Sequence, residues 1–197
     1  MCGLAGLFLP KGAPAVTADL EAMLAAIRHR GPDGFGRFVS PDGRFQAGFA
    51  RLAIIDLATG DQPLVEPGGG RVFLGNGEIY NYRELRAELE GRGHVFSTSG
   101  DMEPALKLLA EKGLDFVHDL NGMYGLAVWE RDAGRLVLVR DRLGIKPVYW
   151  SRLPGGGIIF ASEIKVLFAS GLVAAEVDEA MVTPWLAHGY VPAPTTL

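Results

Sequence analysis

Along the chain, the spacing of apolar residues alternates between the period of a strand and that of a helix. Short apolar runs bounded by turn residues predict strands at residues 3–9, 45–55, 72–80, 95–98, 123–129, 136–139 and 158–161. Helical spacing of apolar residues after Thr17, a candidate N-cap, predicts a helix from about residue 20 that ends before Gly31. Asn81 with Glu84 resembles a capping box and predicts a second helix. A third helix is expected from Asp101.

The run at residues 123–129 scarcely alternates between apolar and polar residues, which predicts a strand covered on both faces. Short turn segments at 131–134 and 154–157 predict antiparallel hairpins rather than parallel crossovers. Helices are expected at both ends of the sequence. The pattern therefore favours an α+β fold, a four-layer α/β/β/α sandwich of two antiparallel sheets.

Composition narrows the class of protein. The 197 residues, 48% of them hydrophobic, suit one packed domain, and the net charge of −4 without a basic run predicts no nucleic-acid partner. No apolar run is long enough to cross a membrane, so no membrane partner is expected. A single cysteine excludes an internal disulfide and fits a cytoplasmic location. The four histidines lack metal-ligand spacing, so no metal site is predicted.

The single cysteine, Cys2, becomes the first residue if the initiator methionine is removed. A thiolate is a strong nucleophile, and an α-amino group titrates near neutral pH, so one residue could supply both attack and proton transfer. The alternative is that Cys2 is a small buried apolar residue.

Three further positions have two interpretations each. Arg51 lies in an apolar run, where it either binds a carboxylate or stands at a sheet edge with its charge in water. Asn76-Gly77 is either a hairpin turn or an oxyanion hole built from a side-chain amide and a backbone N–H. Asp101 either caps a helix or binds an ammonium group.

Six blocks of sequence, taken together and in order, resemble one known family. They are MCGLAG (1–6), HRGPDG (29–34), RLAIID (51–56), GDQPL (60–64), NGEIYN (76–81) and RDRLGIKP (140–147). The chain is similar to the N-terminal glutaminase domain of glutamine-dependent asparagine synthetases. These are class II glutamine amidotransferases with the N-terminal nucleophile hydrolase fold, which agrees with the sandwich expected from the pattern.

The resemblance implies a reaction and its residues. Cys2 would attack the side-chain amide of L-glutamine with its own α-amino group as base, while Asn76 and Gly77 stabilise the oxyanion. The products would be glutamate and ammonia, formed through a γ-glutamyl thioester. The implied glutamine-binding residues are Arg51 for the α-carboxylate, Glu78 and Asp101 for the α-ammonium, Asn76 and Gly77 at the oxyanion, and Leu52, Ala53, Ile54 and Ile55, whose backbone groups would line the pocket.

The chain also departs from the family pattern. Gly100 stands directly before Asp101, where the family usually has serine. The Ser-Gly-Gly-x-Asp-Ser loop that binds ATP in the family's C-terminal synthetase domain does not occur, so no cofactor is expected here, and ATP and Mg are expected only in that missing domain. We predict a glutaminase domain at 1–181 and the start of a connector at 182–197, with residues 185–197 weakly anchored.

The resemblance leaves alternatives for the role of the chain. Its ammonia would be delivered to an ATP-activated carboxylate, with aspartate as acceptor and asparagine as product. A different acceptor, such as a sugar or a cell-wall carboxylate, and a non-catalytic scaffold or binding module are the alternatives. The expected partners are L-glutamine, a C-terminal synthetase domain and a second copy of the chain in a homodimer.

Overall fold

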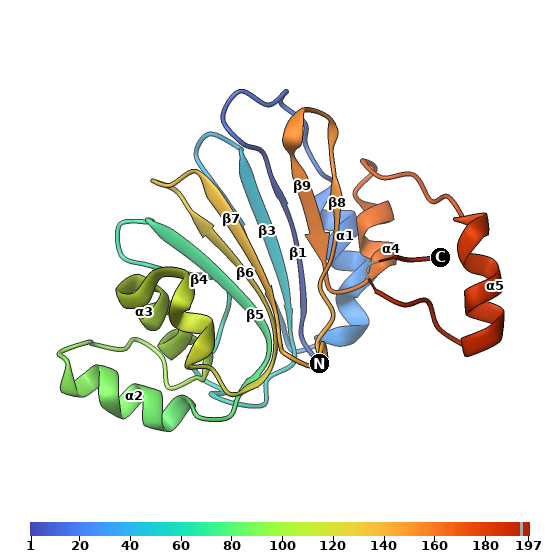
Figure 1. Ribbon diagram of the computed structural model, residues 1–197. Helices are drawn as coiled ribbons and strands as arrows, with labels where there is room; N and C mark the ends of the chain where they lie inside the picture. Colours follow the sequence, from blue (N-terminus) through green and yellow to red (C-terminus); the bar gives the residue numbers. More distant parts are fainter. Residues whose placement is uncertain (194) are drawn as a thin grey trace.

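The computed structural model describes residues 1–193 and 195–197 as two antiparallel sheets packed face to face (Figure 1). The first sheet has the order β2-β3-β1-β9-β8, with β1 Gly3–Phe8, β2 Gly34–Val39, β3 Phe45–Arg51, β8 Tyr149–Arg152 and β9 Ile158–Ala161. The second has the order β4-β5-β6-β7, with β4 Leu64–Val65, β5 Arg71–Ile79, β6 Gly122–Glu130 and β7 Arg135–Arg140.

Helices cover the outer face of each sheet, as Figure 1 shows. α1 (Leu20–Ile27) and α4 (Ile164–Ala169) lie on the first sheet. α2 (Tyr82–Gly91) and α3 (Met102–Lys112) lie on the second. Three 3₁₀ turns, at Arg28–Arg30, Gly113–His118 and Pro154–Gly156, and α5 (Glu179–His188) complete these elements. The predicted four-layer sandwich is confirmed.

Three apolar clusters correspond to the three interfaces between these layers. Leu7, Met23 and Ile27 belong to the cluster under α1 and α4. A second cluster joins β5 and β6 to α2 and α3, and the third fills the space between the sheets with residues such as Phe45 and Trp129, whose rings stack at 5.1 Å. Burial of apolar surface in all three interfaces is the main favourable contribution to folding.

Strand β6 confirms the expectation drawn from its lack of alternation. Leu126 and Val128 pack toward α2 and α3, whereas Ala127 and Trp129 face the other sheet. All four side chains are buried. A strand whose two faces are both covered needs no polar residue on either face.

Several predicted elements are wrong in detail. The N-cap of α1 is Asp19 rather than Thr17, because the Asp19 carboxylate accepts a hydrogen bond from Ala22 N at 2.9 Å. The predicted strand at 95–98 does not form. β3 ends at Arg51, so residues 52–55 leave the sheet.

The capping box expected at Asn81 is also wrong. Its side chain makes no cap bond to α2. Instead its amide donates to Asp119 O at 2.9 Å and accepts from Asn121 N at 3.0 Å, which ties the start of α2 to the start of β6. The Asn81 side chain therefore bonds to residues distant in sequence instead of capping the helix that follows it.

The last helix, α5, has no buried residue. Beyond it, Leu197 O accepts a hydrogen bond from Asp178 N at 2.7 Å. The predicted domain boundary at residue 181 lies inside α5, and the division of the chain and the weak anchoring of 185–197 stay predictions. Within 1–193 and 195–197, no helix is both long enough and apolar enough for a membrane crossing.

Candidate active site

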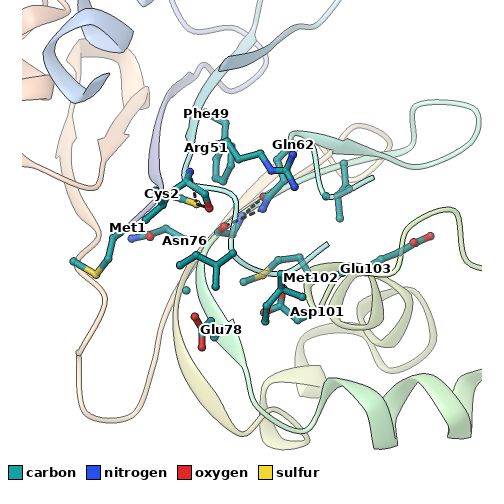
Figure 2. Close-up of a pocket in the computed structure, with 18 of the residues that line it drawn as sticks. Met1, Cys2, Phe49, Arg51, Gln62, Asn76, Glu78, Asp101, Met102 and Glu103 are labelled. Atoms are coloured by element: carbon teal, nitrogen blue, oxygen red, sulfur yellow. Dashed lines mark hydrogen bonds between the residues drawn. The ribbon is translucent and has the colours of Figure 1, made fainter. Parts of the chain in front are cut away.

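Cys2 lies directly before β1 and lines a pocket formed where β1, β3 and β5 approach two loops (Figure 2). Figure 2 places Cys2 and Arg51 on one side of this pocket and Asp101 with Glu103 across from them. Every site residue named from the sequence except Ala53 lines it: Cys2, Arg51, Leu52, Ile54, Ile55, Asn76, Gly77, Glu78 and Asp101. The Ala53 N–H donates instead to Asp33 at 2.9 Å.

The Cys2 thiol is half-buried and bonded to one residue of the loop that follows β3. Its Sγ accepts from Leu52 N at 3.3 Å and donates to Leu52 O at 3.4 Å. Burial raises the pKa of the thiol, although the Leu52 N–H and the terminal ammonium of the chain oppose that shift. A thiol with a raised pKa requires a base before it can attack a substrate.

Asn76 lies inside β5, opposite Gly125 of β6, so the hairpin-turn interpretation of Asn76-Gly77 is wrong. The side chain is 1% exposed. With the amide nitrogen facing Cys2, Nδ2 donates to Cys2 O at 2.8 Å and Oδ1 accepts from Arg30 Nη2 at 3.2 Å. An amide has two N–H donors, so one is left for a ligand in the pocket.

Gly77 is a glycine for reasons of space and conformation. Its φ of 151° is one that other residues rarely adopt, and a Cβ there would lie 1.9 Å from Met123 O on β6. The glycine therefore lets β5 approach β6 closely beside Asn76.

Arg51 is the last residue of β3, an inner strand of its sheet, and is 9% exposed. The sheet-edge interpretation with the charge in water is therefore wrong. Its Nη1 donates to Asp61 Oδ1 at 2.9 Å, and its Nη2 donates to Asp56 O. Arg51 thus pairs with a carboxylate of the chain itself, on the loop between β3 and β4, and its binding of a substrate carboxylate stays a prediction.

Asp101 precedes α3 and is 7% exposed. Asp101 occupies the N-cap position of α3, as predicted, but its carboxylate makes no cap bond there and accepts from Ile79 N at 2.8 Å instead. Burial raises the pKa of Asp101, and the nearby Glu78 raises it further. A buried carboxylate beside a second one is an environment that a bound cation would stabilise.

Two residues that sequence reasoning assigned no role hold the parts of the site together. Arg30 Nε donates to Cys2 O at 2.9 Å, and Arg30 Nη1 donates to Glu163 Oε1 at 3.0 Å. Gln62 bonds both backbone groups of Gly75, with Oε1 2.6 Å from Gly75 N and Nε2 3.1 Å from Gly75 O. Both residues lie in sequence blocks that carry the family resemblance, and that resemblance was the signal that could have identified them.

Glu103 and Lys146 also line the pocket, and both are buried. The Glu103 carboxylate accepts hydrogen bonds from the N–H and hydroxyl groups of Ser97 and Thr98. Burial by itself raises the pKa of Glu103, but these hydrogen bonds outweigh burial, so the pKa is lowered. Lys146 Nζ lies 2.9 Å from Met1 Sδ. In the part of the chain that the structure describes, no three histidine, cysteine or acidic side chains gather as a metal site would require.

Comparison with known proteins identifies the family of the chain. A model of the glutamine amidotransferase domain matches residues 1–197. Asparagine synthetase [glutamine-hydrolyzing] 2 of Bacillus subtilis is 42% identical over 172 residues, 86% of this chain and 22% of the relative. Asparagine synthetase [glutamine-hydrolyzing] 1 of the same organism is 37% identical over 100% of this chain and 31% of its own length.

A solved structure shares the fold. The glutamine phosphoribosylpyrophosphate amidotransferase of Bacillus subtilis aligns with a TM-score of 0.69 at 20% identity, over 86% of this chain and 44% of that one. The chain spans less than a third of the length of the two asparagine synthetases that it resembles. With a family model matched over all of its residues, the chain belongs to the class II glutamine amidotransferase domain family.

Proposed function

We propose that the chain hydrolyses L-glutamine to glutamate and ammonia. The observation that carries this proposal is the pocket in which the Cys2 thiol meets the buried Asn76 amide, the Arg51 guanidinium and the Asp101 carboxylate. An amino acid carries a carboxylate, an ammonium group and a side chain, and the pocket offers a group of matching chemistry for each. Arg51 would bind the α-carboxylate, and Asp101 with Glu78 the α-ammonium.

The reaction proceeds in two steps in this proposal. The α-amino group of Cys2 takes the thiol proton as Sγ attacks the side-chain carbonyl carbon of glutamine. The Asn76 amide and the Gly77 N–H stabilise the oxyanion, and its collapse breaks the C–N bond while the α-ammonium returns the proton to the departing ammonia. Water then attacks the thioester, which releases glutamate and restores the thiol.

This mechanism depends on the removal of Met1. In the structure Met1 precedes Cys2 and lines the pocket, so the α-amino group belongs to Met1 rather than to Cys2. The test combines intact mass with a glutaminase assay. Chains that lack Met1 should convert glutamine to glutamate and ammonia, and chains that retain it should not. Equal activity in both forms would contradict the role of the Cys2 amine.

The asparagine synthetase relatives favour aspartate as the final acceptor of the ammonia, in an ATP- and Mg-dependent domain outside these residues. A sugar or cell-wall carboxylate as acceptor and a non-catalytic scaffold remain alternatives, since the pocket contains no group specific for the acceptor. Retention of Cys2 with its surrounding polar groups speaks against the scaffold.

Replacing Arg51 by alanine is expected to raise the glutamine KM. The α-carboxylate is remote from the reacting amide, so its binding is nearly equal in the ground and transition states, and kcat should change little. A charge-assisted, bidentate pair is worth ~2 kcal/mol or more, which predicts a KM roughly 30-fold higher. Steady-state kinetics checks this, with Arg51→Lys as the control that keeps the charge. A fall in kcat at constant KM would contradict the assignment.

A further inference from the structure

The loop between β3 and β4 surrounds the outer end of the Arg51 guanidinium. Nη1 donates to Asp61 Oδ1 at 2.9 Å and to Leu57 O at 3.4 Å, and Nη2 donates to Asp56 O. Gly60 lies so close that a Cβ there would be 2.7 Å from Nη2. Among these partners, Asp61 is the one that contributes a charge.

These bonds leave one edge of the guanidinium available. Arginine has five N–H donors, and Nε with one hydrogen of Nη2 forms the side-on fork that binds carboxylates in two parallel bonds. Within residues 1–193 and 195–197, Arg51 Nε has no hydrogen-bond partner. Arg51 lines the pocket, as do Gly60 and Gln62 on either side of Asp61, whereas Asp61 itself does not.

Asp61 is held in place on both sides along the chain. Before it, Asp56 accepts from Thr59 N at 2.8 Å and from Ser99 N at 2.9 Å, which fastens the loop to the segment that leads to Asp101. After it, Gln62 is bonded to both backbone groups of Gly75 on β5. Figure 2 marks the hydrogen bonds of Gln62 with dashed lines. The loop therefore presents Asp61 to Arg51 from a fixed position.

We propose that Asp61 is a positioning residue for the substrate: it binds the outer nitrogen of Arg51 and so turns the Nε and Nη2 edge toward the α-carboxylate of glutamine. The inference rests on the proposed function, in which Arg51 binds that carboxylate. The Asp61 side chain is 84% exposed and that of Arg51 is 11% exposed, so Asp61 acts from the surface on a buried group. It would set the affinity for substrates that carry the α-carboxylate and leave the chemistry at Cys2 unchanged.

An arrangement in which Asp61 and the substrate compete for Arg51 predicts the opposite change in KM. If Asp61 competed with the substrate for Arg51, its removal would free the guanidinium and lower KM. Because exposed carboxylates contribute little to stability, Asp61 variants should fold normally, and kinetics can then decide between the two signs.

The experiment compares Asp61→Asn with the parent chain for L-glutamine and for its α-amide, which lacks the carboxylate. We expect the glutamine KM to rise roughly three- to tenfold with kcat within twofold, and the KM for the α-amide to stay constant. In an Arg51→Lys background, Asp61→Asn should have little further effect. Asp132→Asn is the control, because Asp132 is 83% exposed and also pairs with an arginine, Arg131, far along the chain from the loop.

Calorimetric binding of glutamine to Cys2→Ala chains, with and without Asp61→Asn, gives the same comparison without turnover. A weaker Kd in the double variant supports the proposal. An unchanged or lower KM and Kd, or an equal effect on the α-amide, overturns it while parent-chain turnover keeps the glutaminase function intact. Absence of turnover in a parent chain that intact mass shows to lack Met1 counts against the proposed function instead, and absence of glutamine binding counts against both.

Discussion

Cys2→Ala is expected to abolish the release of glutamate and ammonia while the protein folds and binds glutamine. Loss of a nucleophile in a hydrolase of this chemistry lowers kcat by roughly 10⁴-fold or more, and Cys2 supplies the single thiol of the sequence. The fold should persist, since the thiol is half-buried and its partners are a single backbone N–H and carbonyl of Leu52.

Three measurements check this expectation: a glutamate-release assay, thermal unfolding and calorimetric binding of glutamine. The melting temperature should stay within a few degrees of the parent value, and glutamine should still bind. Turnover clearly above the background of a heat-inactivated sample would show that another nucleophile does the work.

Asn76→Ala is expected to lower kcat by roughly a hundredfold or more. An oxyanion donor is typically worth ~3 kcal/mol in the transition state and much less in the ground state, so KM should change little. The same substitution also removes the bonds from the amide to Cys2 O and Arg30. Steady-state kinetics should therefore be combined with thermal unfolding, which reports how much stability is lost with these hydrogen bonds.

Asn76→Asp separates the two contributions. Aspartate has nearly the shape of asparagine and can still accept from Arg30, but it has no N–H donor and would place a negative charge beside a developing oxyanion. We expect it to melt closer to the parent than Asn76→Ala does and to be at least as inactive. A nearly normal kcat in Asn76→Asp would rule out Asn76 as the oxyanion donor.

Burial on both faces could be predicted for β6 because the pattern that specifies it is local: consecutive apolar residues from Leu126 to Trp129 leave no polar face. Strand β2 was not predicted, because Gly34 and Gly36 interrupt the alternation of apolar and polar residues along it. Space explains Gly36, where a Cβ would lie 1.7 Å from Gln62 O. Position 36 requires a glycine because of a neighbour distant in sequence, and a local sequence pattern carries no information about that neighbour.

The candidate site shows the same difference between features set by a local pattern and features set by contacts distant in sequence. Asn76-Gly77 has the residues of a hairpin turn, yet cross-strand pairing with β6 holds both residues in a strand. The apolar and hydroxyl residues at 95–98 resemble a strand, but Glu103 draws the N–H groups of Ser97 and Thr98 to itself. The resemblance predicted Arg51 and Asp101 as site residues, and both line the pocket. It did not predict Asp61 and Ile79 as their partners, because those contacts depend on how the loops fold back.

The position of Met1 in the pocket wall has a practical consequence for how the protein is prepared. An affinity tag fused to the N-terminus would begin at the wall of the pocket, where Met1 is 52% exposed, and would keep the Cys2 nitrogen in a peptide bond. A tag at the C-terminus would extend from the side of α5, which Figure 1 shows well separated from the N-terminus. Under the proposed mechanism, an N-terminally tagged preparation would be inert even when it is correctly folded, pure and monodisperse, for a reason that no measure of folding would reveal.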